Sequence, residues 1–177
     1  MSNVTMVSSL KDLEALENVP WEEVSPAIST YELLAEAAAR WPDKTAITFL
    51  PNSTIEDEPV RITYKDMLGR ITQTANMFND LGVGPYDAVS FLLPLLPQTQ
   101  FTLWGAEAAG IANPINFLLS SDQIVDLLNA AKTKVLVALG PNPNLPIWEK
   151  VENIRDRVPT LKALIQVGGP GDEVNPR

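Results

Sequence analysis

The sequence contains neither cysteine nor histidine. Without cysteine it can form no disulfide bond, no thiolate metal site and no thiol nucleophile. Without histidine it lacks the commonest general base and zinc ligand, and it cannot build a Ser-His-Asp triad. Any chemistry performed by this chain would therefore depend on carboxylates, lysines or backbone groups.

Basic residues are scarce as well. The chain has 13 Lys and Arg against 22 Asp and Glu, a formal net charge of −9. Nucleic acids and anionic lipid surfaces attract clustered Lys and Arg, so this balance argues against both as partners. The excess of acidic residues is typical of a chain whose charge keeps it dispersed in water.

Long hydrophobic runs are also missing. The longest lies around Phe91–Pro97, far short of the roughly 20 apolar residues that a membrane-spanning helix needs. Met1–Leu10 has no basic segment followed by an apolar one, so we read no signal peptide. From these features we expect no membrane span and a cytoplasmic location.

What is present is typical of a globular protein, with 45% hydrophobic and 20% charged residues in 177. A chain of this length can bury about 70% of its unfolded surface. Residues 1–28 form an acidic N-terminal arm, in which a short helix is plausible around Leu10–Glu17. We expect an α/β subdomain over residues 29–168 and a loop or truncation boundary over 169–177. The acidic residues of the arm are Asp12, Glu14, Glu17, Glu22 and Glu23.

The first firm helix is predicted over Tyr31–Arg40. Ser29 and Glu32 have the spacing of a capping box, in which each side chain accepts a hydrogen bond from a free N–H group. After it, Thr45–Leu50 and Val60–Tyr64 alternate and are rich in β-branched residues. They predict a hairpin with a long acidic connection.

The next helix is predicted over about Tyr64–Leu81, with Thr63 as its N-cap and Gly82 at its C-terminal end. Beyond it, short apolar runs without polar alternation are separated by amphipathic helices. Strands of this kind are buried on both faces. The pattern predicts an α/β fold with a mainly parallel sheet flanked by helices. The expected strands are Ala88–Leu93, Ile111–Ile115, Lys134–Leu139 and Leu161–Val167; the expected helices are Pro97–Gly110, one capped by Ser120 and Gln123, and one marked by Ile147, Val151, Ile154 and Val158.

Three short motifs could suggest chemistry, and each has a stronger structural interpretation. Gly82–Gly84 follows a helix, whereas a dinucleotide fingerprint follows a strand, so a helix cap and turn is favoured. Gly168–Gly171 follows a strand but lacks a Lys or Ser/Thr at phosphate-loop spacing, and Pro170 removes a donor. Ser120 and Ser121 have no base to activate them, and a capping role accounts for them.

Other polar and aromatic residues are weaker candidates. A lone carboxylate on an apolar helix, such as Glu107, usually faces solvent. A pair of carboxylates one helical turn apart, such as Asp122 and Asp126, usually lies on a helix surface and binds no metal. Phe101, Trp104 and Phe117 could line a ligand cleft, although core packing is the commoner role. Ligands of open α/β sheets bind outside the carboxyl ends of strands. Asn116 and Phe117 follow a strand, so we single them out as a substrate-side loop.

Five segments, in this order, resemble those of AMP-forming, adenylate-forming enzymes. They are Pro42–Ile47, Ile62–Met67, Leu81–Val89, Ala106–Asn116 and Lys134–Val137. The sequence Asn-Pro-Ile-Asn at the end of the fourth segment is similar to the corresponding sequence of acyl-CoA synthetases. The resemblance identifies the chain as an N-terminal segment of such an enzyme, part of its large N-terminal domain.

The resemblance implies a two-step reaction. A carboxylic acid, expected to be fatty or aromatic, attacks ATP to give acyl-adenylate and pyrophosphate, and coenzyme A then displaces AMP. Mg²⁺ and a lysine offset the phosphate charge. The family's phosphate loop, adenine motifs and catalytic lysine match no position here. We therefore assign no catalytic, cofactor-binding or metal residue, and we expect this segment alone to bind none of these cofactors and to be inactive.

Two departures and two alternatives accompany this interpretation. Tyr86 replaces the usual glycine before Asp87, which costs about 1–2 kcal/mol if the turn is left-handed. Phe117 and Leu118 replace residues that are usually polar or basic.

A stand-alone, non-catalytic α/β module that binds a ligand or partner is the alternative function. An uncovered strand at the sheet edge would favour a homodimer.

Overall fold

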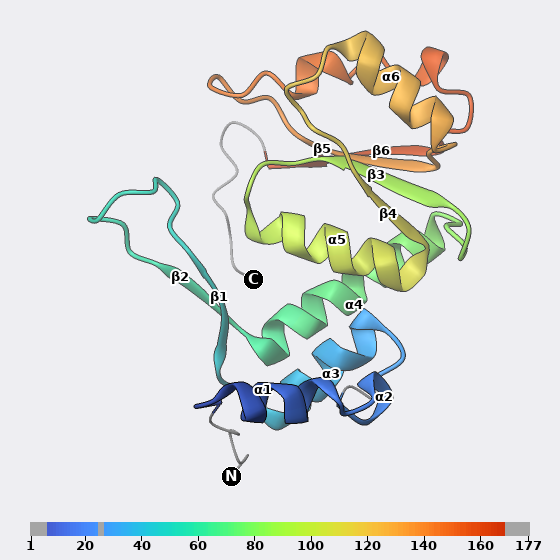
Figure 1. The fold of residues 1–177 in the computed structure, drawn as a ribbon. Coiled ribbons are helices and arrows are strands. Elements are labelled where there is room, and N and C mark those ends of the chain that lie inside the picture. The colour runs from blue at the N-terminus through green and yellow to red at the C-terminus, as the bar shows by residue number, and fades with distance from the viewer. Residues whose placement is uncertain (1–6, 25–26, 169–177) are drawn as a thin grey trace.

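The computed structural model describes residues 7–24 and 27–168. The order of helices and strands (Figure 1) follows the predicted succession closely. The elements are α1 Leu10–Glu17, α2 Trp21–Val24, α3 Thr30–Arg40, β1 Thr45–Phe49, β2 Val60–Thr63, α4 Tyr64–Asp80, β3 Ala88–Leu92, α5 Pro97–Ala109, β4 Ile111–Pro114, α6 Ser121–Ala130, β5 Val135–Leu139, the 3₁₀ segments η1 Trp148–Lys150 and η2 Arg155–Arg157, and β6 Ala163–Val167.

The main sheet has four strands in the order β4-β3-β5-β6, and every pairing is parallel. Its two central strands, β3 and β5, are buried at every residue. This explains why their sequences are apolar apart from Ser90 and show no polar alternation, because both faces are covered. The predicted parallel sheet is confirmed. The separate pair β1 and β2 is antiparallel, as expected of a hairpin.

The helices lie in layers on both sides of the sheet (Figure 1). One face is covered by α6 and the 3₁₀ segments. The other is covered by α5, with α4 packed against α5 and α3 beyond it. The β1–β2 hairpin projects from the side of this stack. Residues of α1 are all at least partly exposed. Within residues 7–24 and 27–168, no helix has the length and apolar character to cross a bilayer.

The core is built around the two central strands. Phe78 from α4, Leu92 and Leu136 from the strands, and Ile124 and Leu128 from α6 have essentially no exposed surface. Each large aliphatic or aromatic side chain buried in this way contributes about 1.5–3 kcal/mol. These residues lie in one hydrophobic cluster, so the layers on both sides of the sheet share one core.

Helix caps form where the sequence predicts them. Ser29, Thr63 and Ser120 each accept a hydrogen bond from the backbone three residues on. One detail of the prediction is wrong. The carboxylate of Glu32 accepts a hydrogen bond from the N–H of Ile28 at 2.7 Å. In a capping box it would accept from the N–H of the N-cap residue, Ser29.

The helix predicted through Ile147, Val151, Ile154 and Val158 is also wrong. The backbone there forms only the short 3₁₀ segments η1 and η2. All four side chains are nevertheless at most 2% exposed. Successive 3₁₀ turns also return side chains to one face every three or four residues. The apolar spacing therefore identified the buried residues correctly but not the backbone that presents them.

The turn that carries Tyr86 is not left-handed. Among the described residues other than glycine, only Ser53 and Lys132 have a positive φ. The expected strain at Tyr86 is therefore absent, and its side chain is 91% exposed. The left-handed position falls instead at Gly82, with φ of 83°, where the sequence predicts a helix-ending glycine.

Candidate ligand-facing edge of the sheet

The carboxyl ends of the four strands lie along one edge of the sheet because all four strands run the same way. Phe91 is level with Pro114, and Leu139 is level with Val167. The loops that follow the strands therefore meet at this edge, which we call the carboxyl edge. In open parallel sheets this is where ligands bind. The loop after β4, residues 115–120, contains the two predicted site residues.

Asn116 is exposed, and its side chain shapes the loop. Its Oδ1 accepts from the N–H of Leu118 at 3.0 Å, and its backbone carbonyl accepts from the N–H of Leu119 at 3.2 Å. An asparagine that bonds to the backbone two residues on forms an Asx-turn. Asn116 is thus a turn-forming residue at the carboxyl edge, a role that its sequence position alone did not specify.

Phe117 is half-buried and packs against the hydrophobic core. It anchors the loop, whereas the next residue, Leu118, is 76% exposed. A second leucine with 86% exposure, Leu95, lies in the loop that follows β3. The carboxyl edge therefore presents apolar side chains to whatever covers it.

Lys150 was not identified from the sequence. Its Nζ donates to the carbonyl oxygens of Phe117 at 2.7 Å and Leu119 at 3.0 Å. Its own carbonyl accepts from the hydroxyl of Ser121 at 2.8 Å. Nothing in the sequence around Lys150 distinguishes it from an ordinary surface lysine. Its hydrogen-bond partners are backbone atoms 31 and 33 residues away.

A second polar cluster lies at the opposite edge, where β3 and β5 begin. The Asp87 carboxylate accepts from Lys134 Nζ and from the N–H of Gly84, both at 2.8 Å. Lys134 also donates to the carbonyl of Gly82. The hydrogen bond from Lys134, followed by that from Gly84, lowers the pKa of Asp87. This cluster ties the turn after α4 to the start of β5, which is a structural role.

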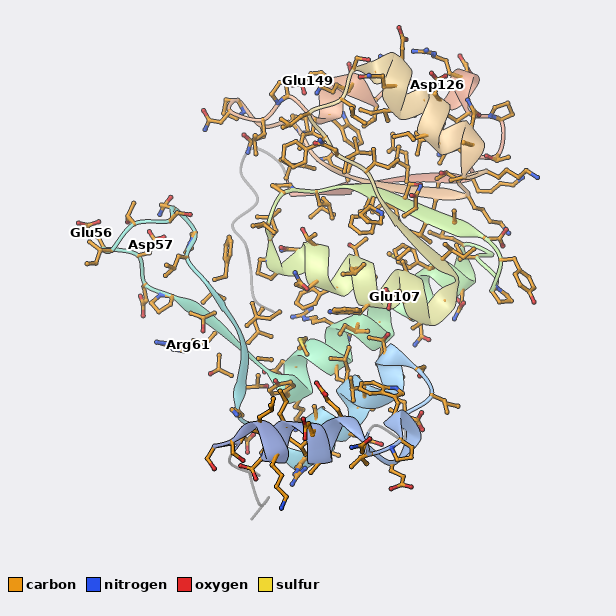
Figure 2. The ribbon with its side chains drawn as sticks, in the orientation of Figure 1. Glu56, Asp57, Arg61, Glu107, Asp126 and Glu149 are labelled. Atoms are coloured by element: carbon orange, nitrogen blue, oxygen red, sulfur yellow. The ribbon has the colours of Figure 1, made fainter. Side chains whose placement is uncertain are left out.

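Glu107 lies apart from the carboxyl edge, near the end of α5 that precedes β4 (Figure 2). It is exposed and borders a cavity of about 550 Å³ between α3, α4 and α5. The hydroxyls of Tyr31 and Thr72 are hydrogen-bonded there at 2.8 Å. The predicted residues Phe101 and Trp104 are half-buried on α5. The cavity is lined by Ser29, Thr30, Tyr31, Thr72, Ala75, Asn76, Asn79, Glu107 and Ala108.

Of the predicted acidic pair on α6, Asp122 pairs with Arg157 at 2.7 Å. Asp126 lies on the outer layer of the molecule, as does Glu149 (Figure 2). Across residues 7–24 and 27–168, no group of three or more acidic residues is arranged to hold a metal ion. Of the glycines at 168–171, only Gly168 is described, with φ of 66°, and the rest lie outside the described residues.

Residues 34–174 match the family described as AMP-binding enzyme. A marinolic acid–CoA ligase from a Pseudoalteromonas species is 31% identical over 94% of this chain and 26% of its own length. An acetyl-coenzyme A synthetase from Rubrobacter xylanophilus is 27% identical over 75% of this chain and 21% of its own. The chain thus spans about a quarter of the length of these relatives.

Solved structures share the fold. The acetoacetyl-CoA synthetase of Streptomyces lividans matches 81% of this chain and 23% of its own, with a TM-score of 0.70 and 24% identity. The N-terminal domain of FACL13 from Mycobacterium tuberculosis matches 80% of this chain and 34% of its own, with a TM-score of 0.66 and 22% identity. At these identities the match concerns the fold, which is that of N-terminal domains of adenylate-forming enzymes.

Proposed function

The chain belongs to the AMP-binding enzyme family, and from this premise we propose that it is the N-terminal segment of an ATP-dependent acyl-CoA synthetase. The whole enzyme would convert a carboxylic acid, ATP and coenzyme A into acyl-CoA, AMP and pyrophosphate. The observation that carries the proposal is the family match over residues 34–174, together with a parallel sheet whose strands all end at one edge.

Within that enzyme we assign the segment a supporting role. Its sheet would hold the loop of Asn116 and Phe117 against a substrate, while ATP and Mg²⁺ would be held by residues of the whole enzyme. The described residues include no carboxylate cluster suited to a metal, and the chain has no histidine. Mg²⁺ therefore enters the proposal only as a property of the complete enzyme.

We further propose that the segment alone does not adenylate, that it forms a homodimer through an edge strand of its sheet, and that it is cytoplasmic. ATP–pyrophosphate exchange on the purified chain, with a panel of fatty and aromatic acids, tests the first statement. Acid-dependent exchange above background would contradict it. Cell fractionation tests the location.

A positive test of the function needs the rest of an enzyme. We suggest a chimera in which this chain replaces the matching 26% of the marinolic acid–CoA ligase. We expect acid-dependent exchange in the chimera but not in the chain alone. Circular dichroism and thermal unfolding of the chimera identify misfolding if exchange is absent.

The alternative function is a stand-alone, non-catalytic α/β module. The apolar residues at the carboxyl edge, Leu95 and Leu118, favour it to the extent that such a surface can hold a ligand or partner by itself. In that case the chain would bind an apolar acid without ATP. Calorimetric titration of the chain with the same acids separates the two functions.

A further inference from the structure

Lys150 bridges two segments that are distant in sequence. Its side chain is extended from η1, after β5, to the loop after β4, where its ammonium lies between two backbone carbonyls at 2.7 and 3.0 Å. The return bond from Ser121 to the Lys150 carbonyl closes the bridge at 2.8 Å. The loop is therefore tied to η1 on both sides of Ser120.

The origin of this bridge is fixed by the core. Ile147 and Val151, on either side of η1, are 1% and 0% exposed, so η1 cannot shift without disturbing buried packing. Immobilising a lysine side chain has an entropy cost, because its long stem loses many rotamers. Hydrogen bonds from an ammonium are stronger than those between neutral groups, and two of them offset this cost. The arrangement is more ordered than that of a solvated surface lysine.

We propose that Lys150 is a positioning residue for the loop of residues 116–119. Its ammonium group holds the backbone of this loop in the conformation in which the loop contacts a substrate. This inference rests on the proposed function. The loop turns Phe117 inward to the core and leaves Leu118 76% exposed. The group that it meets is therefore apolar, and belongs either to the carboxylic acid or to coenzyme A.

The first test uses the chain itself. Lys150→Met keeps the apolar stem and removes the donors, Lys150→Arg restores a cation, and Lys162→Met removes an exposed lysine elsewhere as a control. By NMR, we expect amide hydrogen exchange at Leu118 and Leu119 to be about tenfold faster in Lys150→Met. Lys150→Arg should recover most of the protection. Equal rates in Lys150→Met and the unmodified chain would overturn the inference.

The second test uses the chimera. We expect Lys150→Met to raise the KM for either the acid or coenzyme A by about tenfold, while kcat and the KM for ATP change by less than about twofold. Separate titrations identify which substrate the loop meets. A loosened loop with all three KM values unchanged would refute the positioning role and leave the proposed function intact. An inactive but folded chimera with Lys150 in place would contradict the proposed function, and the exchange rates would still decide whether Lys150 orders the loop.

Discussion

At the residue scale, Asp87 is the acidic group with the clearest electrostatic role. Its carboxylate is held by Lys134 and Gly84, which lowers its pKa. A carboxyl whose pKa is lower when folded stabilises the fold above its unfolded pKa of about 3.9. That stabilisation is lost as the pH falls through the lower, folded value.

We therefore expect Asp87→Asn to unfold at a lower urea concentration than the unmodified chain at pH 7. The difference should shrink below about pH 4 and vanish once Asp87 is protonated in the folded state. Asp126→Asn is the control, because Asp126 is exposed on α6. A difference that stays constant from pH 7 to acid would show that the Lys134 contact is not the cause.

Gly82 and Tyr86 make a matched pair within one turn. Gly82 has a φ of 83°, with no atom closer than 4.0 Å to an added Cβ. Gly82→Ala should therefore cost about 1–2 kcal/mol from backbone strain alone. Tyr86→Gly should bring no gain, and a loss of up to about 1 kcal/mol from added freedom in the unfolded chain. Urea unfolding measures both. A stabilising Tyr86→Gly would mean that the tyrosine is strained after all.

At the element scale, the sequence predicts best where local signals and burial agree. The α4 helix shows this, since Thr63 caps it, Gly82 ends it and its apolar positions recur at helical spacing. The segment through Ile147 and Val158 shows the limit. Its spacing fits a helix, yet packing on the sheet is satisfied by two 3₁₀ turns.

The candidate site follows the same division. The place of Asn116 and Phe117 could be predicted because a loop after a parallel strand must lie at the carboxyl edge. Lys150 could not, because its partners are backbone carbonyls whose proximity depends on how β4 and β5 are ordered in the sheet. A sequence pattern predicts on which face of a helix or strand each side chain lies. Contacts between distant segments depend in addition on the order of the strands in the sheet.

The β6 strand is the edge strand through which we propose that the chain self-associates. The expected strand Leu161–Val167 lies at an edge of the sheet as β6, whereas β5 is paired on both sides. A strand with one free edge offers backbone groups to another copy. We expect light scattering to show a dimer at high protein concentration.

Gln166→Lys should weaken this dimer, because Gln166 is exposed on β6 and a lysine on an edge strand discourages pairing. Asp126→Lys adds a lysine on α6, away from the edge, and should leave the dimer unchanged. A monomer at all concentrations, or equal effects of the two variants, would rule out pairing through β6.

At the scale of the whole molecule, the sheet and the helices packed on it support the loops at the carboxyl edge. The layers of α6, sheet, α5 and α4 share one core, so the chain has the packing of a folded subdomain. Its carboxyl edge carries exposed leucines, and the described residues include no group of three or more acidic residues arranged to hold a metal ion. We propose that the chemistry needs further residues of a whole synthetase.

The proposed function is tested most directly by acid-dependent ATP–pyrophosphate exchange in the chimera with the marinolic acid–CoA ligase, measured beside the chain alone. We expect exchange in the chimera and only background in the chain. A correctly folded chimera without exchange, or exchange by the chain alone, would contradict it.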